Sequence, residues 1–276
     1  MKIGVTGGKG GTGKSTVATA LANELSKNKK ILLIDADVDC PNDDMILSID
    51  TEKVREIKNM IPKIDEEKCI KCGKCVEVCR ENALVQIKDK NPFLIKEQCT
   101  GCKACEYKCP VGAITESSQL IGSIHKGGKQ GIDLIKGELK PGIEEASLVV
   151  NAVKDYVKKE EKKYDHIIID TAAGTHCPVI SALIGTDLAI AVTEPTPLGN
   201  HDLELILQLT KELEIPSKTV VNRSNIGNIE KTLEITEKYK SETIGKIPYS
   251  RRIQEKYAAG EPIEHEEINK ILKVIQ

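Results

Sequence analysis

The fold of this chain is decided by one stretch of sequence, Gly7-Gly8-Lys9-Gly10-Gly11-Thr12-Gly13-Lys14-Ser15-Thr16. An apolar run, residues 2–6, precedes it and predicts a short buried strand. Apolar residues at helical spacing follow it and predict a helix from about Lys14 to Asn28. Gly8 to Ser15 match G-x4-G-K-[ST] in the strand, loop and helix setting that this motif requires. The stretch therefore predicts a loop whose backbone N–H groups surround phosphate at a helix N-terminus.

Each polar residue of this loop has an expected role. We expect the Lys14 ammonium to reach the outer phosphates and the Ser15 hydroxyl to ligate Mg²⁺. The positions expected to bind the nucleotide are Gly8, Gly10, Gly11, Thr12, Gly13, Lys14, Ser15 and Thr16.

The rest of the chain alternates apolar runs with helical patterns, apart from one interruption. Predicted strands are 31–34, 166–170, 188–193, 219–222 and 244–247, and predicted helices are about 147–161, 200–213 and 229–240. Continuous apolar runs are typical of strands covered on both faces. The pattern predicts an α/β fold with a mostly parallel sheet and helices on both faces. Residues 121–140 predict a β-hairpin that turns at Gly127-Gly128.

The interruption is rich in cysteine and is internally duplicated. Two runs of C-x2-C-x2-C-x3-C follow one another, at Cys69, Cys72, Cys75 and Cys79 and then at Cys99, Cys102, Cys105 and Cys109. This is the bacterial ferredoxin spacing, in which the fourth cysteine of each run ligates the other cluster. It predicts two 4Fe-4S clusters, one on Cys69, Cys72, Cys75 and Cys109 and one on Cys99, Cys102, Cys105 and Cys79. Zinc is the alternative, but its sites use paired C-x2-C steps.

The phosphate loop resembles the deviant Walker A motif of the MinD/ParA/Mrp and nitrogenase iron protein superfamily, because it carries the extra Lys9. The resemblance implies that Lys9 reaches the partner's phosphates in an ATP-dependent homodimer. It implies that Asp37, and next Asp35, orients the attacking water, and that Asp170 holds the Mg²⁺ shell. It also implies that Asn222, Arg223 and Pro248 bind the adenine.

Two units are expected from this reading. The P-loop ATPase domain comprises residues 1–61 and 117–276, and an α+β ferredoxin-like domain, residues 62–116, is inserted into it. Insertion succeeds at exposed loops, and this one follows the second predicted strand and its acidic loop.

Composition limits the partners and the location. Lys+Arg 40 against Asp+Glu 42 gives a net charge of −2, and there is no Trp, so nucleic acid is not expected as a partner. Because no signal-peptide pattern or long apolar run is present, we expect a cytoplasmic protein with no stable membrane insertion. Residues 268–276 predict a docked terminal helix.

Two cysteines lie outside the duplicated runs. Cys177 follows Asp170 by seven residues, where the nitrogenase iron protein has a cluster ligand, so it is either a thiolate near a dimer axis or a small buried thiol. Cys40 is expected to be inert.

Three functions remain open from the sequence. The favoured one is an ATPase whose hydrolysis in a homodimer gates electron transfer through the two clusters to a redox partner. The alternative is an Mrp-like carrier that delivers iron-sulfur clusters to apo-proteins. The third, ranked last, is a positioning ATPase of the MinD or ParA kind.

Overall fold

A nine-stranded sheet forms the centre of the molecule in the computed structural model, which describes residues 1–261 and 263–275. In spatial order its strands are β11 Glu242–Ile247, β10 Ser217–Asn222, β9 Leu188–Thr193, β1 Lys2–Thr6, β8 His166–Thr171, β2 Ile31–Ala36, β7 Ile132–Leu139, β6 Ile114–Lys129 and β3 Thr51–Ile64. The strands from β11 to β7 are parallel, whereas β6 and β3 pair antiparallel at one edge. The predicted α/β fold with a mostly parallel sheet is therefore confirmed.

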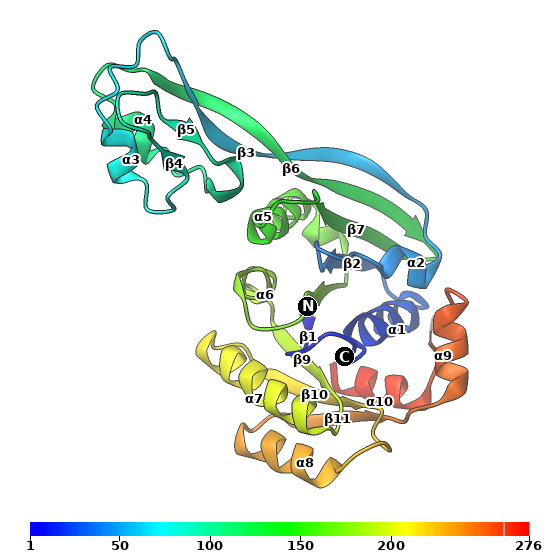
Figure 1. Ribbon diagram of the computed structural model, residues 1–276. Helices are drawn as coiled ribbons and strands as arrows, with labels where there is room; N and C mark the ends of the chain where they lie inside the picture. Colours follow the sequence, from blue (N-terminus) through cyan, green and yellow to red (C-terminus); the bar gives the residue numbers. More distant parts are fainter. Residues whose placement is uncertain (262, 276) are drawn as a thin grey trace.

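Helices cover both faces of this sheet, as Figure 1 shows. The larger helices and the short helix after β2 are α1 Lys14–Ser26, α2 Asp43–Leu47, α5 Ala146–Val157, α6 Cys177–Leu183, α7 Pro197–Glu212, α8 Ile229–Lys238, α9 Arg251–Ala258 and α10 Glu266–Ile275, and a 3-10 turn spans Glu161–Lys163. Because side chains alternate along a strand, Leu33 packs against α1 while Leu32 and Ile34 pack against α5. Both faces of the strands are buried, which explains their continuous apolar runs.

The predicted hairpin forms, but its turn lies elsewhere. Gly127 and Gly128 are inside β6, and the chain reverses at Gln130 and Gly131, which have φ values of 51° and 82°. Two successive residues with positive φ are what a tight hairpin turn requires. Gly127 is needed for another reason, since a Cβ there would lie 2.4 Å from the Asp50 carbonyl oxygen on the neighbouring chain segment.

Strands β3 and β6 extend beyond the sheet and carry a small unit at their far end (Figure 1). The unit contains α3 Lys74–Val78, β4 Leu84–Val85, β5 Phe93–Leu94, a 3-10 turn at Lys96–Gln98 and α4 Ala104–Lys108. Its separate core holds four buried side chains, two of them cysteines: Cys75, Leu84, Cys105 and Ile114. The domain boundaries predicted at residues 61 and 116 fall inside the two long strands, so the unit is attached by a β-ladder rather than by loops.

The last helix is docked, as predicted. Ile268, Ile271, Leu272 and Ile275 of α10 are buried in the same core as α1. Within the described residues, no helix is long and apolar enough to cross a membrane.

Candidate nucleotide site

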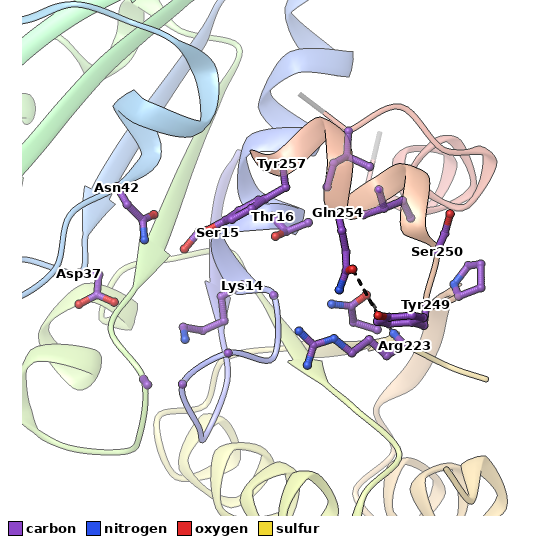
Figure 2. A pocket seen from close by; sticks show the side chains of 18 residues that line it. Lys14, Ser15, Thr16, Asp37, Asn42, Arg223, Tyr249, Ser250, Gln254 and Tyr257 are labelled. Carbon is purple, nitrogen blue, oxygen red and sulfur yellow. Dashed lines mark hydrogen bonds between the residues drawn. The ribbon is translucent and has the colours of Figure 1, made fainter. Parts of the chain in front are cut away.

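A cavity of about 400 Å³ lies at the carboxyl ends of the parallel strands (Figure 2). In open parallel sheets this edge is where ligands bind. The lining residues are Gly10, Gly11, Gly13, Lys14, Ser15, Thr16, Asp37, Asn42, Ala173, Asn222, Arg223, Pro248, Tyr249, Ser250, Ile253, Gln254, Tyr257 and Ile263. Most of the loop positions predicted from the sequence therefore meet in one place.

The loop between β1 and α1 leaves room for a ligand where its glycines lie. A Cβ on Gly10 or Gly11 would meet nothing within 4 Å, so the cavity reaches their backbone. Gly13 has a φ of 95°, and a Cβ there would lie 2.2 Å from Asn222 Nδ2, so only glycine fits. Helix α1 begins at Lys14 with no side-chain cap and no acidic residue in its first turn. Its first N–H groups are consequently available to an anion.

Lys9 does not line this cavity and is held within its own chain. Its ammonium donates to Glu194 Oε1 at 2.7 Å, and Arg223 Nη1 donates to Glu194 Oε2 at 2.9 Å. The Glu194 side chain is only 7% exposed. Burial alone would raise the pKa of Glu194, but the hydrogen bonds from Lys9 and Arg223 outweigh it and hold the pKa below its usual range. One carboxylate, which sequence reasoning missed, therefore links two predicted site residues.

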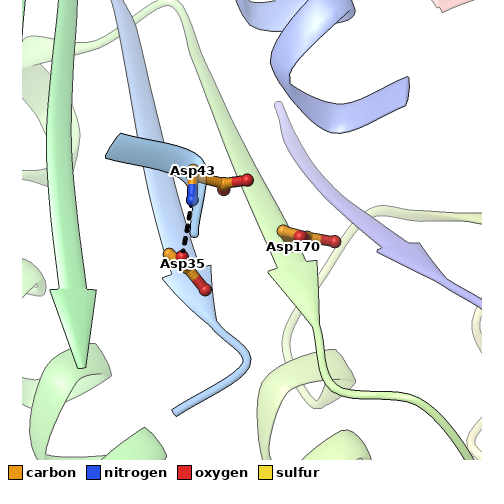
Figure 3. Close-up of side chains that lie close together, drawn as sticks. All are labelled: Asp35, Asp43 and Asp170. Atoms are coloured by element: carbon orange, nitrogen blue, oxygen red, sulfur yellow. Dashed lines mark hydrogen bonds between the residues drawn. The ribbon is translucent and has the colours of Figure 1, made fainter. Parts of the chain in front are cut away.

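Two predicted acidic residues meet a third that was not predicted (Figure 3). Asp35 and Asp170 are register partners on the neighbouring strands β2 and β8, and Asp43 begins α2. One carboxylate oxygen from each lies within 4.8 Å of the others, and all three residues are buried. Burial first, and then repulsion between the carboxylates, raises the pKa of Asp35 and of Asp43 well above the usual range. Burial raises the pKa of Asp170 to about 7, despite hydrogen bonding with Ser15 and the nearby Lys14 charge.

Asp37, the predicted water-orienting residue, lies at the cavity wall and not in this acidic group. Burial raises the pKa of its carboxyl, and the positive charge of Lys14 opposes that rise. A half-buried carboxylate that faces both the cavity and the lysine could accept a proton from a water molecule near the phosphates.

The far end of the cavity is built by residues from the last third of the chain. Asn222 Nδ2 donates to the Thr12 carbonyl oxygen at 2.8 Å, which joins the end of β10 to the phosphate loop. Pro248 and Tyr249 line this end, and Tyr249 Oη donates to Gln254 Oε1 at 3.2 Å (Figure 2). The contribution of α9, through Ile253, Gln254 and Tyr257, was missed because its sequence is polar and carries no motif.

The remaining predicted loop residues support the cavity from outside. Gly8 packs against α7, where a Cβ would lie 2.5 Å from Asp202 Cβ, and Thr12 is 1% exposed. Cys177 begins α6 and is exposed, so the buried-thiol alternative is wrong. Cys40 is exposed as well.

The eight cysteines of the small unit line two separate cavities. One is lined by Cys69, Cys72, Cys75 and Cys109, among other residues, and the second by Cys79, Cys99, Cys102 and Cys105. Burial raises the pKa values of Cys75 and Cys99, and that of Cys105 to about 11. Among the described residues, ligand atoms converge within 4.8 Å only at the three aspartates, so neither cysteine set is drawn together as it would be around one ion.

Residues 3–263 match the nucleotide-binding domain family CbiA, described as CobQ/CobB/MinD/ParA. The chain belongs to this family of P-loop ATPases. Among its relatives is an uncharacterized protein of Methanocaldococcus jannaschii, 38% identical over 95% of this chain and 90% of the relative. The septum site-determining protein MinD of Bacillus subtilis is 23% identical over 80% of this chain and 64% of its own length.

Solved structures share the fold. The cell division ATPase MinD of Pyrococcus furiosus aligns with a TM-score of 0.61 at 19% identity and covers 99% of this chain and 97% of its own. MinD of Pyrococcus horikoshii, solved with Mg-ADP, aligns with a TM-score of 0.60 at 18% identity, over 99% of this chain and 93% of its own.

These comparisons overturn the functional prediction. The relatives with a named function include MinD proteins, and the structural neighbours include cell division and plasmid partition proteins. The names of these proteins refer to cell division and plasmid partition, not to electron transfer or cluster delivery. The predictions of gated electron transfer and of cluster delivery are therefore wrong, and the redox partner or apo-protein that they required has no support. The supported class is the one that was ranked last, the ATPases of the MinD and ParA kind.

Proposed function

We propose that this chain binds ATP with Mg²⁺ in the cavity at the β1–α1 loop and hydrolyses it. The single observation that carries the proposal is that Lys14, Ser15 and Asp37 face one cavity whose glycine-lined end is open to the backbone. Residues of α1 and of α9 both line this cavity, so the two helices can contact different parts of one ligand. MinD of Pyrococcus horikoshii was solved with Mg-ADP, which supports the choice of nucleotide and cation.

Each residue has one part in this proposal. The N–H groups of residues 10–16 hold the phosphate oxygens, and Lys14 neutralises their outer charge. The hydroxyl of Ser15 ligates Mg²⁺. Asp170 lies beside Ser15 and has one oxygen without a partner among the described residues, so the site fits a hydrated divalent cation. Asp37 accepts the proton of the attacking water, whereas Asp35, the second candidate from the sequence, is buried and does not line the cavity.

The base of the nucleotide lies at the other end of the cavity. Asn222, Arg223 and Pro248 provide polar and apolar contacts there. The ring of Tyr249, held by Gln254, adds an aromatic surface against which adenine can stack.

We also propose that the working unit is an ATP-dependent homodimer in which Lys9 acts on the partner's nucleotide. In the single chain Lys9 is bonded to Glu194 and does not line the cavity. Because Lys9 does not contact the nucleotide cavity of its own chain, we propose that it acts in the cavity of the partner chain. Pairing of two chains then requires the bond between Lys9 and Glu194 to open.

ATP binding and hydrolysis thereby switch the chain between two states, as in a positioning ATPase of the MinD and ParA class. The apolar face of α10 is buried in the core, so this helix does not serve as a membrane anchor. The small unit on the β3–β6 ladder is the part that we expect to meet a partner.

For the small unit, residues 62–116, we propose an inserted ferredoxin-like domain that holds two 4Fe-4S clusters with a structural role. Two cavities, each lined by four cysteines, support this, and the sets are those that the duplicated spacing predicts. A cube distributes its thiolates over four iron corners, so its ligands lie farther apart than around a single zinc ion. Among the described residues no three cysteine sulfur atoms lie within 4.8 Å of one another, so neither set is preformed for a single zinc ion.

The nucleotide proposal is tested by ATP hydrolysis and by molar mass in solution. Purified protein should hydrolyse ATP only with Mg²⁺, and its mass should double with a non-hydrolysable ATP analogue. Lys9→Ala should abolish hydrolysis and leave ATP binding in place, while the exposed control Lys29→Ala should behave as wild type. Unchanged hydrolysis in Lys9→Ala would show that Lys9 has no catalytic part.

The cluster proposal is tested by iron content after anaerobic purification. About eight irons per chain are expected for two cubes. Cys105→Ser should remove about half of that iron, because Cys105 lines one cavity only. Cys177→Ser is the matched control and should keep all of it. Protein that binds zinc and no iron would contradict the proposal.

A further inference from the structure

Helix α2 begins with a buried carboxylate that the motifs do not account for. Asp43 is 0% exposed, and within the described residues neither of its side-chain oxygens has a hydrogen-bond partner. A buried polar group without a partner costs roughly 1–3 kcal/mol, and a charged one costs more. A bound ligand that pairs with the Asp43 carboxylate would remove this cost.

The surroundings of Asp43 are acidic. Figure 3 shows its side chain directed toward the space beside Asp170, with Asp35 below. One oxygen from each lies within 4.8 Å of the others, and one oxygen of Asp170 also has no partner in the described part of the chain. Lys136 does not neutralise this group, because its ammonium is bonded to Asp44 instead.

The backbone holds this arrangement in place. Asp35 accepts hydrogen bonds from the N–H groups of Asp37, Asn42 and Asp43 at 2.8–3.1 Å. These bonds fold the acidic loop back onto the end of β2 and fix the start of α2 above β8. The three carboxylates are therefore brought together by the backbone rather than by chance rotamers.

We propose that Asp43, Asp35 and Asp170 together bind one Mg²⁺ or Mn²⁺ ion directly, before the nucleotide arrives. Hard divalent cations prefer oxygen ligands, and each of the three aspartates offers one. The cation cancels the repulsion of three buried negative charges, which otherwise requires protonation. The site would deliver the metal to the phosphates rather than receive it with them. This inference depends on the proposed nucleotide site for its purpose, but it concerns nucleotide-free protein.

The test uses the full chain without nucleotide and Mn²⁺ as the probe. Electron paramagnetic resonance should show one bound Mn²⁺ per chain, and Mn²⁺ should raise the melting temperature. In Asp43→Asn the affinity for Mn²⁺ should fall by about tenfold or more, because one of three carboxylates is lost. Asp50→Asn, which removes an exposed carboxylate from the following loop, should bind Mn²⁺ as wild type does.

A second measurement keeps the test decisive if the variant changes stability. Asp43→Asn should melt higher than wild type without metal, since a repulsive charge is gone, and should no longer gain stability from Mn²⁺. Wild-type protein that binds no Mn²⁺, or an Asp43→Asn variant that binds it equally well, would overturn the inference. ATP binding measured with Mg²⁺ on the same samples reports separately on the nucleotide site, so the two proposals can fail independently.

Discussion

The sheet and the small unit at the end of the β3–β6 ladder are stabilised in different ways. The sheet buries a continuous core of aliphatic side chains on both faces, including Ile3, Leu21 and Ile168 at 0% exposure. The core cluster of the small unit contains only four buried side chains, and two of them are cysteines. Small units bury little apolar surface, and many of them gain stability from metal or disulfide cross-links. The difference teaches that the sheet is stabilised by hydrophobic burial on both faces, whereas the small unit has little such burial and relies on its thiols under the cluster proposal.

The largest effect should come from the sheet's site. Lys14→Ala removes the charge that neutralises phosphate in a cavity where this lysine is only 6% exposed. Removing one partner from a buried charge pair costs about 3–5 kcal/mol, so ATP affinity should fall by about 100-fold or more. Titration calorimetry with ATP and Mg²⁺ measures this. Retained affinity would place the nucleotide elsewhere.

Iron removal should separate the two regions. Chelation under reducing conditions should leave amides of residues 65–113 open to hydrogen exchange, while those of β1, β8 and β9 stay protected, because the apolar core of the small unit is much smaller than that of the sheet. Exchange mass spectrometry at peptide resolution measures both regions at once. If both lose protection together, the comparison between them fails.

A pH effect should be confined to the sheet and its acidic group. The pKa of Asp170 is raised to about 7, so the folded chain binds more protons than the unfolded chain between pH 4 and 7. Metal-free protein should therefore lose stability as pH rises through this window, by on the order of a few kcal/mol. Asp170→Asn should weaken that dependence without removing it, because the raised pKa values of Asp35 and Asp43 contribute to it as well. Urea titrations at pH 5 and pH 8 provide the measurement, and parallel pH dependence in the two proteins would contradict it.

The smallest effect concerns the bond between Lys9 and Glu194. Glu194→Gln removes a carboxylate shared by two part-exposed cations, so stability should fall by about 1 kcal/mol, which lowers the melting temperature by about 2–4 °C. Because Lys9 is then released, dimer formation with an ATP analogue should need less analogue than in wild type. The surface variant Glu204→Gln is the control for loss of an exposed ion pair. Weaker dimer formation in Glu194→Gln would show that Glu194 supports the dimer instead.

The sheet could be predicted closely because its signals are local. The run 188–193 is β9 to the residue, and 166–170 is one residue shorter than β8. Burial on both faces leaves a continuous apolar pattern that a sequence displays directly. The phosphate loop was predictable for the same reason, since glycine requirements such as that at Gly13 are written into the motif.

The parts that the sequence did not reveal depend on contacts between distant residues. The position of Asp43 beside Asp170 follows from the β2–β8 register and the fold of the acidic loop, and nothing near Asp43 in the chain indicates it. Glu194 meets Lys9 across 185 residues. The turn after β6 was misplaced because Gly127 serves close packing against Asp50 rather than reversal. The function was misjudged because the cysteine motifs describe the small unit, while the relatives are defined by the sheet.

The β3–β6 ladder connects the region of the three buried aspartates to the small unit at its far end. Helix α2 begins at Asp43 and leads within a few residues to β3, which is paired with β6 along its whole 14-residue length. Such a strand measures about 46 Å at about 3.3 Å per residue. A tilt of about 5° at the sheet would displace the far end by about 4 Å. A small tilt of the ladder beside the nucleotide site would thus displace the cysteine-containing unit by a larger distance.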